Sequence, residues 1–520
     1  MSEARPTLNP MRSNTRAALW SCLVLFFSSG PLLGQCDVAH LALANADPFD
    51  QLGRSVAIDG SRVLAGAHDA DGVDLNTGTA TIFTEGPTGW SATATLVASD
   101  GLPFDNFGVA ADLEGNVAII GAPGRDELGA YSGAAYVYRF NGTVWIEEAK
   151  LLASDGGQDA NFGSAVAVDG DTVIVGAPTA TVLGVLTGAA YLFRRVGGVW
   201  VEETKFIASD AQNFDQFGVS ISLAGEWALI GAPGHVIGVQ TVGAAYLYRF
   251  DGIDWDAETK LIASDADAGD FFGYAVDLDA NVAVVGAIEN CLCSVPPGPI
   301  GTGAAYVFRR TGIAWAEETK LLPTNLDVDQ WFGSSVSIDG NDVIVGAQNA
   351  PGLTFATGAA TLYTFEAGAW SETAILVASD GGSSDFYGTS VSLRGGLAVV
   401  GAPLHADTSG GTGAAYLYTV GAGGCTGQFQ RGDCNGDGST NIADAIFHLL
   451  VLFPAAGVPP APVCRDACDS NDDGGLDIAD AISTLVALFG APPIPLPEPL
   501  ACGVDPTADA LSCLQYAGCP

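Results

Sequence analysis

Short apolar segments, separated by turns rich in glycine and aspartate, run through most of the chain. One stretch shows the pattern clearly and predicts four strands, at residues 164–169, 172–176, 189–194 and 200–208. Asp169-Gly170 and Gly197-Gly198 are typical of tight turns between antiparallel neighbours. One such unit is therefore expected to form a four-stranded antiparallel sheet.

This unit recurs seven times. Its first mark is a glycine that follows an aromatic residue or a leucine, at Gly53, Gly108, Gly163, Gly218, Gly273, Gly333 and Gly388. A Gly-Ala pair begins thirteen residues later, at Gly66, Gly121, Gly176, Gly231, Gly286, Gly346 and Gly401. A third mark, Gly-Ala-Ala-Tyr or a variant, begins at Gly78, Gly133, Gly188, Gly243, Gly303, Gly358 and Gly413. The interval between successive units is constant, except for a longer one between the fifth and sixth.

Four antiparallel strands repeated seven times predict an all-β, seven-bladed β-propeller, with an open stack of sheets as the alternative. The seventh unit ends near Tyr418 without a fourth strand, whereas residues 38–45 form an apolar segment ahead of the first unit. Leu41 precedes the first marker glycine by twelve residues, the same spacing that separates Leu151 from Gly163. We therefore expect the N-terminal strand to complete the last blade and close the ring.

Two cysteines fall in adjacent positions of the repeat at this closure. Cys425 takes the position that Trp145 has in the second unit, and Cys36 takes the position of Ile146. Because a closed ring would bring these positions together, we predict a disulfide between Cys36 and Cys425. Such a long-range cross-link is expected to stabilise the propeller by up to about 5 kcal/mol.

The Phe-Gly and Gly-Ala-Pro marks resemble those of FG-GAP repeats, which build the propeller of integrin alpha subunits. The resemblance covers residues 36–425. Members of this family often carry a calcium-binding hairpin between the first two strands. Here the corresponding turns, such as Asp59-Gly60 and Asp339-Gly340, are too short to enclose calcium. We therefore expect no calcium in these hairpins.

Strand direction divides the loops between the two faces of the ring. The loops from strand two to three and from strand four to the next blade share one face, which we call the looped face. These loops are the longer ones, so the looped face is the predicted binding face for a protein or glycan ligand. Within it, Asp69, Asp71 and Asp74 form an oxygen cluster with Asn76 that is either a calcium site or a solvated loop.

Aspartates recur in the four–one loops. One set stands eight residues before the marker glycine, at Asp100, Asp155, Asp210, Asp265 and Asp380. Another stands three or four residues before it, at Asp50, Asp105, Asp159, Asp215, Asp270, Asp329 and Asp385. Both sets are expected to cap turns by accepting hydrogen bonds from backbone N–H groups, with an acidic ring for cations as the alternative.

The sequence offers no arrangement that predicts catalysis. The five histidines, His40, His68, His235, His405 and His448, occupy distant positions of the repeat pattern. No Ser-His-Asp order, phosphate-binding loop or zinc-ligand spacing stands out. We expect a protein that is not an enzyme. Because carboxylates suited to glycoside hydrolysis are abundant, a polysaccharide-active propeller enzyme is one alternative, and a structural or adhesion protein at the surface is another.

After the repeats, two twelve-residue loops carry oxygen side chains at positions 1, 3, 5, 9 and 12. The first has Asp433, Asn435, Asp437, Asn441 and Asp444, with the carbonyl of Ser439 at position 7. The second has Asp469, Asn471, Asp473, Asp477 and Asp480, with the carbonyl of Gly475 at position 7. This spacing wraps hard oxygen ligands around calcium, so two calcium ions are predicted. Helices are expected after the loops, at residues 445–453 and 481–489.

Together the two loop–helix units, residues 431–490, resemble a type I dockerin. The resemblance implies a small α-helical module that folds around calcium and docks to a cohesin-type partner. The family's partner-contact positions correspond here to Ile442, Ala443, Ile478 and Ala479, which are more apolar than the family's usual hydroxyl pairs. A purely structural calcium domain is the alternative. Residues 491–520 form a proline-rich spacer and a cysteine-containing tail.

Composition and the N-terminus bear on location. Arg12 and Arg16 precede an apolar segment at residues 17–27, which is too short to span a bilayer, so residues 1–34 are predicted to be a cleaved secretory signal. With 59 acidic and 19 basic residues the net charge is −40, which disfavours binding to nucleic acids and anionic membranes. The sequence thus predicts a secreted or cell-surface, calcium-binding interaction protein with no membrane insertion.

Overall fold

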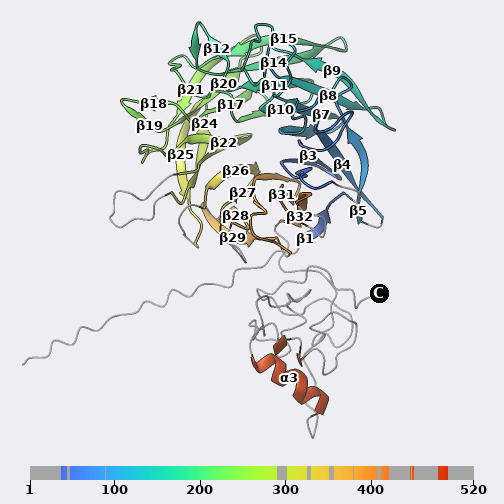
Figure 1. The fold of residues 1–520 in the computed structure, drawn as a ribbon. Coiled ribbons are helices and arrows are strands. Elements are labelled where there is room, and N and C mark those ends of the chain that lie inside the picture. The colour runs from blue at the N-terminus through green and yellow to red at the C-terminus, as the bar shows by residue number, and fades with distance from the viewer. Residues whose placement is uncertain are drawn as a thin grey trace, which may run out of the picture.

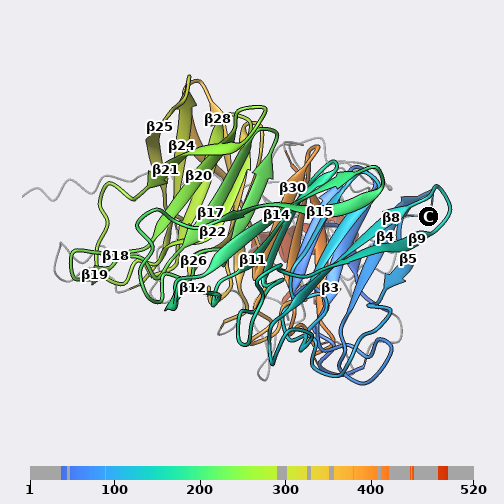
Figure 2. The ribbon, with the colours of Figure 1, turned by 90° about the horizontal axis from the view of Figure 1, so that it is seen from above.

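The computed structural model describes residues 37–43, 47–87, 89–289, 301–324, 330–350, 356–378, 380–406, 411–420, 445–446, 448–449 and 478–489. Within them, seven four-stranded antiparallel sheets are arranged as the blades of a propeller (Figure 1). The prediction of an all-β, seven-bladed propeller is therefore confirmed. Seen from above, neighbouring sheets lie face to face (Figure 2).

The first six blades each take their strands from one repeat. Blade one comprises β2 (Ser55–Asp59), β3 (Arg62–Ala67), β4 (Thr79–Gly86) and β5 (Gly89–Leu96). Blade two comprises β6 (Ala111–Glu114), β7 (Val117–Ala122), β8 (Ala134–Phe140) and β9 (Trp145–Leu151). Blade three comprises β10 (Ala165–Asp169), β11 (Thr172–Ala177), β14 (Ala189–Val196) and β15 (Val199–Phe206).

Blade four comprises β16 (Ile221–Ala224), β17 (Trp227–Ala232), β20 (Ala244–Phe250) and β21 (Trp255–Leu261). Blade five comprises β22 (Phe272–Asp279), β23 (Val282–Ala287), β24 (Ala304–Thr311) and β25 (Ala314–Leu321). Blade six comprises β26 (Phe332–Asp339), β27 (Asp342–Ala347), β28 (Ala359–Glu366) and β29 (Ala369–Leu376). Two small hairpins extend the two–three loops of blades three and four: β12 (Thr181–Val182) with β13 (Val185–Leu186), and β18 (Val236–Ile237) with β19 (Gln240–Thr241).

Blade seven is made from both ends of the repeat region. Its strands are β30 (Ser390–Arg394), β31 (Leu397–Ala402), β32 (Ala414–Thr419) and the N-terminal β1 (Asp37–Leu41). Leu41 pairs with Ala415 just as Leu151 pairs with Ala135, so the N-terminal strand enters in the predicted register. Figure 1 shows β1 beside β32 where the ring closes.

The glycine marks lie where adjacent blades touch. A Cβ added to the Gly-Ala glycine of one blade would overlap the carbonyl oxygen of the marker glycine in the next, as for Gly121 against Gly163. The same contact joins Gly401 of blade seven to Gly53 of blade one, so the closing interface is built like the others. The third-mark glycines adopt positive φ, and five of them pair with the aromatic residue before the next marker, for example Gly133 with Phe162. These close backbone approaches require glycine.

The core consists of apolar layers between blades. One layer combines Val117 and Ile119 of blade two with Val173 and Val175 of blade three. The layer at the closure combines Leu41 and further residues of blade seven with residues of blade one. Because each layer needs both neighbouring sheets, a single repeat cannot bury its own apolar faces.

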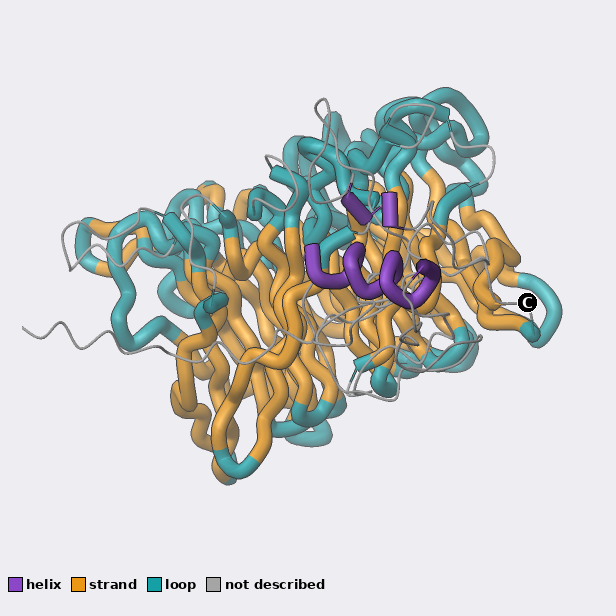
Figure 3. The backbone as a smooth tube through the Cα atoms, turned by 90° about the horizontal axis from the view of Figure 1, so that it is seen from below, coloured by secondary structure: helices purple, strands orange, loops and turns teal. Residues whose placement is uncertain are grey.

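Outside the propeller, the structure describes the helix α3 (Ile478–Phe489) (Figure 3). It covers the second predicted helix and begins three residues earlier than expected. No described helix is long and apolar enough to cross a membrane. All eleven cysteines lie outside the described residues, so the Cys36–Cys425 disulfide stays a prediction.

Candidate functional site

Blades two to five carry the same ionic motif at the looped face, which we call the Tyr–Asp–Lys motif. In blade two, Asp100 accepts a hydrogen bond of 2.8 Å from the Tyr136 hydroxyl and lies 2.9 Å from the Lys150 ammonium. The lysine lies opposite the tyrosine in the strand pairing, so the sheet positions both. The equivalent residues are Asp155, Tyr191 and Lys205, then Asp210, Tyr246 and Lys260, then Asp265, Tyr306 and Lys320.

These contacts stabilise the ionised carboxylate. Burial opposes ionisation, but hydrogen bonds from Lys150 and Tyr136 hold the pKa of Asp100 below its usual value. The pKa of Asp155, Asp210 and Asp265 is lowered in the same way. The main partners of this set are therefore side chains rather than the backbone N–H groups that we expected. The periodic sequence could not show this, because the partner lysine stands in the fourth strand of the following repeat, far along the chain.

The second set of aspartates does cap turns. Asp105 accepts the N–H of Leu102 at 2.7 Å, and Asp215 accepts that of Gln212 at 2.7 Å. Asp50, Asp270 and Asp385 make the same contact with the residue three positions earlier. For these five residues the predicted capping role is confirmed.

The oxygen cluster in blade one is spread over separate local contacts. Asp71 accepts the N–H of Asn76 at 2.9 Å, and Asp74 accepts the N–H of the residue that follows it. Asp69 accepts a hydrogen bond of 2.6 Å from the Gln51 amide. Among the described residues, the group of three potential ligands that lie close together is a different one, in blade seven.

At the centre of the looped face lies a pocket of about 740 Å³. Its lining includes Arg54 and the aromatic side chains of Tyr274, Trp331 and Phe386. Arg54 immediately follows the first marker glycine, a position that holds valine, serine, tyrosine or threonine in the other repeats. Our sequence interpretation missed Arg54. The signal that would have found it is this departure from the chain's own repeat.

Arg54 is notable because it is a cation without a carboxylate partner among the described residues. Within the described part of the chain, its guanidinium makes no ion pair. Burial lowers the pKa of Arg54, because water is partly excluded from the charged group. In a protein with 59 acidic residues, such a guanidinium at a concave, aromatic-lined surface is suited to bind a carboxylate of a ligand.

A second pocket, of about 620 Å³, lies at the opposite face of the ring. Carboxylates in its lining accept hydrogen bonds from backbone N–H groups of neighbouring blades. Asp59 accepts the N–H of Gly115 in the next blade's turn, and Asp339 does the same for Gly395. Asp112 accepts the N–H of Val168, and burial raises the pKa of Asp112 to about 6. These carboxylates link neighbouring blades, so we place the candidate binding site at the looped face.

Exposed phenylalanines stand in the four–one loops that lead into blades one, two and four. Phe49, Phe104 and Phe214 occupy one repeat position and are 68%, 65% and 64% exposed. Each has a φ between 69° and 77°, a left-handed conformation that costs a bulky residue about 1–2 kcal/mol. The same position has a positive φ in Asp159 and Ser384, so this conformation belongs to the loop, and it is their exposure that suits the three phenylalanines to contact a ligand.

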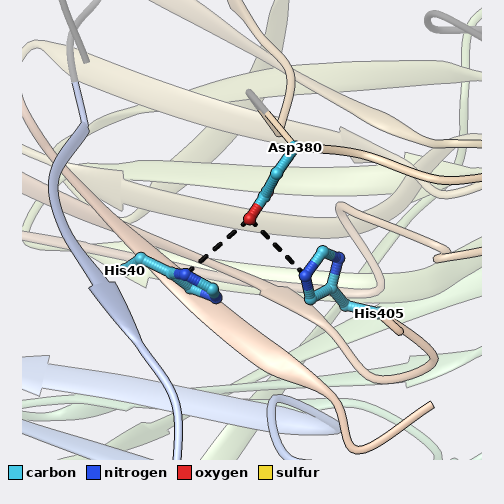
Figure 4. Close-up of side chains that lie close together, drawn as sticks. All are labelled: His40, Asp380 and His405. Carbon is cyan, nitrogen blue, oxygen red and sulfur yellow. Dashed lines mark ion pairs between the residues drawn. The ribbon is translucent and has the colours of Figure 1, made fainter. Parts of the chain in front are cut away.

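Blade seven brings together His40, His405 and Asp380, residues that the sequence interpretation left unconnected (Figure 4). His405 Nε2 lies 3.6 Å and His40 Nδ1 lies 3.8 Å from Asp380 Oδ2. The signal for this cluster was the position of His40, which falls in the lysine position of the Tyr–Asp–Lys motif when β1 is counted as a fourth strand.

Of the calcium and partner-contact residues predicted in the C-terminal loops, the structure describes Asp480 and Ile478 with their side chains. Asp480 is buried in the first turn of α3, and Ile478 is 52% exposed. Ala479 lies in α3, but its side chain is outside the description. The other predicted residues of both loops, and the contact residues Ile442 and Ala443, also lie outside it.

The fold and its central pocket define a seven-bladed propeller of the ligand-binding class. FG-GAP repeats match at residues 36–83, 90–138, 145–193, 200–248, 255–308, 315–363 and 370–418, and the chain belongs to this family. No curated protein matches the chain significantly. The crystal structure of Saccharomyces cerevisiae Sqt1 is similar over 75% of this chain and all of that chain, with a TM-score of 0.40 and 10% identity.

Proposed function

We propose that this chain is a secreted, non-catalytic interaction protein whose propeller binds a carboxylate-bearing protein or glycan in the looped-face pocket. The observation that carries the proposal is Arg54, whose guanidinium has no carboxylate partner among the described residues. Tyr274, Trp331 and Phe386 supply apolar contact area around it. FG-GAP repeat proteins are often extracellular or surface-exposed, which supports the proposed location.

Replacing Arg54 by glutamine is expected to weaken binding of a carboxylate-bearing ligand by at least about tenfold, because a desolvated charge pair is lost. The measurement is calorimetric titration with uronate-containing oligosaccharides, neutral oligosaccharides and acidic peptides. Trp331→Ala tests the aromatic wall separately. Glycosidase activity on the same oligosaccharides, lost in carboxylate variants of the looped face, would favour the enzyme alternative.

The matched control is Arg62→Gln, which changes an arginine of the same blade. Arg62 donates to the Gly115 carbonyl at the opposite face, so its loss leaves the pocket intact. Binding of the same ligand that is equally strong in wild type, Arg54→Gln and Trp331→Ala would place the site elsewhere.

We further propose that residues 431–490 form a calcium-binding, dockerin-like module that docks to a cohesin-type partner. The paired twelve-residue loops support this proposal, and the buried carboxylate of Asp480 at position 12 agrees with it. The four contact residues Ile442, Ala443, Ile478 and Ala479 would form the docking surface.

Calcium titration of the full chain is expected to show two high-affinity sites. Asp433→Ala should remove one and Asp469→Ala the other, because each variant deletes the first carboxylate of a loop. Asp69→Asn, in the propeller, is the control and should retain both sites. Two remaining sites in Asp433→Ala would contradict the assignment. Binding of calcium without calcium-dependent binding of type I cohesins would favour the purely structural module.

A further inference from the structure

The lysine position of the Tyr–Asp–Lys motif is filled differently in blade seven. In blades two to five, the lysine ammonium lies beside the aspartate and over the ring of the tyrosine, 5.0–5.9 Å from its centre. Blade seven keeps the other two groups, since the Tyr416 hydroxyl donates to Asp380 Oδ1 at 2.6 Å. In the lysine position stands His40 of β1, paired with Tyr416 and stacked on its ring at 4.8 Å.

Blade four shows how a cation is held when a histidine joins this motif. His235 lies in the two–three loop, and the ammonium of Lys260 lies 2.6 Å from its Nε2 and 2.8 Å from Asp210 Oδ2. The other ring nitrogen, Nδ1, lies 3.0 Å from Asp215. One carboxylate oxygen and one imidazole nitrogen thus share a single cation.

Blade seven repeats this arrangement without the ammonium. His405 takes the position of His235, and its Nδ1 lies 2.8 Å from Asp385 Oδ2. That oxygen also accepts the N–H of Gly382, so it acts as an acceptor and the Nδ1 of His405 donates to it. His405 Nε2 lies 3.6 Å from Asp380 Oδ2, just as His235 Nε2 lies 3.6 Å from Asp210 Oδ2 in blade four. A cation between these two groups of blade seven would take the place that the Lys260 ammonium has in blade four.

The ligand atoms suit a transition-metal ion. Tetrahedral zinc holds nitrogen and oxygen ligands at about 2.0–2.2 Å, which places the ligand atoms roughly 3.3–3.5 Å from one another. The two histidine nitrogens lie 3.6 and 3.8 Å from Asp380 Oδ2, and the three ligand atoms lie within 4.8 Å of one another. Contraction by a few tenths of an ångström brings Asp380 to the required distance from both histidines, and a rotation of the more exposed His40 ring would bring the two nitrogens closer together. Two imidazoles and one carboxylate favour zinc-class ions over calcium.

The residues around the cluster have the contacts expected of outer-shell partners. Asp385 orients His405 through Nδ1, and Tyr416 orients Asp380 through its hydroxyl. His405 is almost fully buried, with 5% of its side chain exposed, whereas Asp380 is 48% exposed and open to solvent. One side of the cluster is therefore rigid and the other accessible to an incoming ion.

We propose that His40 Nδ1, Asp380 Oδ2 and His405 Nε2 bind one divalent metal ion of the zinc class, with a fourth position left for water. The ion supplies the positive charge that lysine supplies in blades two to five. His40 lies on the N-terminal strand, whereas its two partner ligands come from the other end of the repeat region. The ion therefore fastens β1 to the last blade and closes the ring.

The test compares the untagged, metal-depleted full chain with His40→Lys, which installs the lysine of blade four. With calcium present in excess, calorimetric titration with Zn²⁺ is expected to show one more bound equivalent in wild type than in His40→Lys. Asp380→Asn is expected to lower the affinity of that site by at least about tenfold. Wild type and both variants keep every cysteine, so zinc that binds to thiols adds equally to the stoichiometry of each protein.

Two further measurements keep the result independent of misfolding. Without metal, His40→Lys is expected to melt at or above the temperature of wild type, whereas added Zn²⁺ raises the melting temperature of wild type only. Co²⁺ bound at the site should give the visible bands of nitrogen and oxygen ligands, and His235→Gln should leave them unchanged. Equal zinc stoichiometry in wild type and His40→Lys, or bands that persist in His40→Lys, would overturn the proposal.

Discussion

Replacement of Gly121 by alanine is expected to lower the free energy of unfolding by about 3 kcal/mol or more. The added Cβ would overlap the carbonyl oxygen of Gly163 in the next blade. Both atoms belong to backbone segments of paired strands or their ends, so neither can rotate away as a side chain would. The measurement is guanidinium unfolding followed by tryptophan fluorescence.

Gly157→Ala is the matched control. An added Cβ at Gly157 meets nothing within 4 Å, and the backbone there needs no positive φ. Its effect should stay within about 0.5 kcal/mol, as for most surface substitutions. Similar unfolding midpoints for the two variants would show that the blade interfaces tolerate extra volume and that the repeated glycines serve another purpose.

A chain that begins at Asp47 is expected to lose its monomeric, cooperatively folded state. Removal of β1 leaves β32 as an unpaired edge and exposes the apolar layer that Leu41 helps to bury. Exposed edge strands pair with other chains. Size-exclusion chromatography with light scattering should show oligomers, and the melting temperature should fall by several degrees or more.

A chain that begins at Gln35 keeps β1 and serves as the control. A synthetic peptide of residues 36–46 offers a second check, because an added strand should pair with the β32 edge and restore the monomer. A truncated chain that remains monomeric and melts like the control would mean that β1 contributes little to closure. The same comparison in the presence of Zn²⁺ would separate backbone pairing from the proposed metal ion.

Much of the propeller could be predicted because its information is local and periodic. The marker glycines, the apolar strands and the tight turns repeat at a constant interval with one exception. Counting them yields the number of blades. The missing fourth strand of the seventh repeat and the surplus strand at the N-terminus then yield the closure. The spacing of Leu41 yields the register, which the pairing of Leu41 with Ala415 confirms.

The partners of individual side chains could not be predicted in the same way. Asp100 was expected to cap a turn, yet it binds Tyr136 and Lys150, because the four–one loop passes over the next blade. His40 and His405 stand at opposite ends of the repeat region and meet only in the closed ring. For the calcium loops, which lie mostly outside the described residues, the sequence remains the basis of the prediction.

By itself, the sequence determined the fold class, the blade count and the strand that closes the ring. These features follow from periodic glycine and apolar positions whose geometric demands are the same in every blade. Only the tertiary structure decided which side chains meet, and therefore where the propeller departs from its own symmetry. Arg54 in the central pocket and His40 beside Asp380 are such departures, because charge and coordination depend on neighbours that come from other blades or from the far end of the chain.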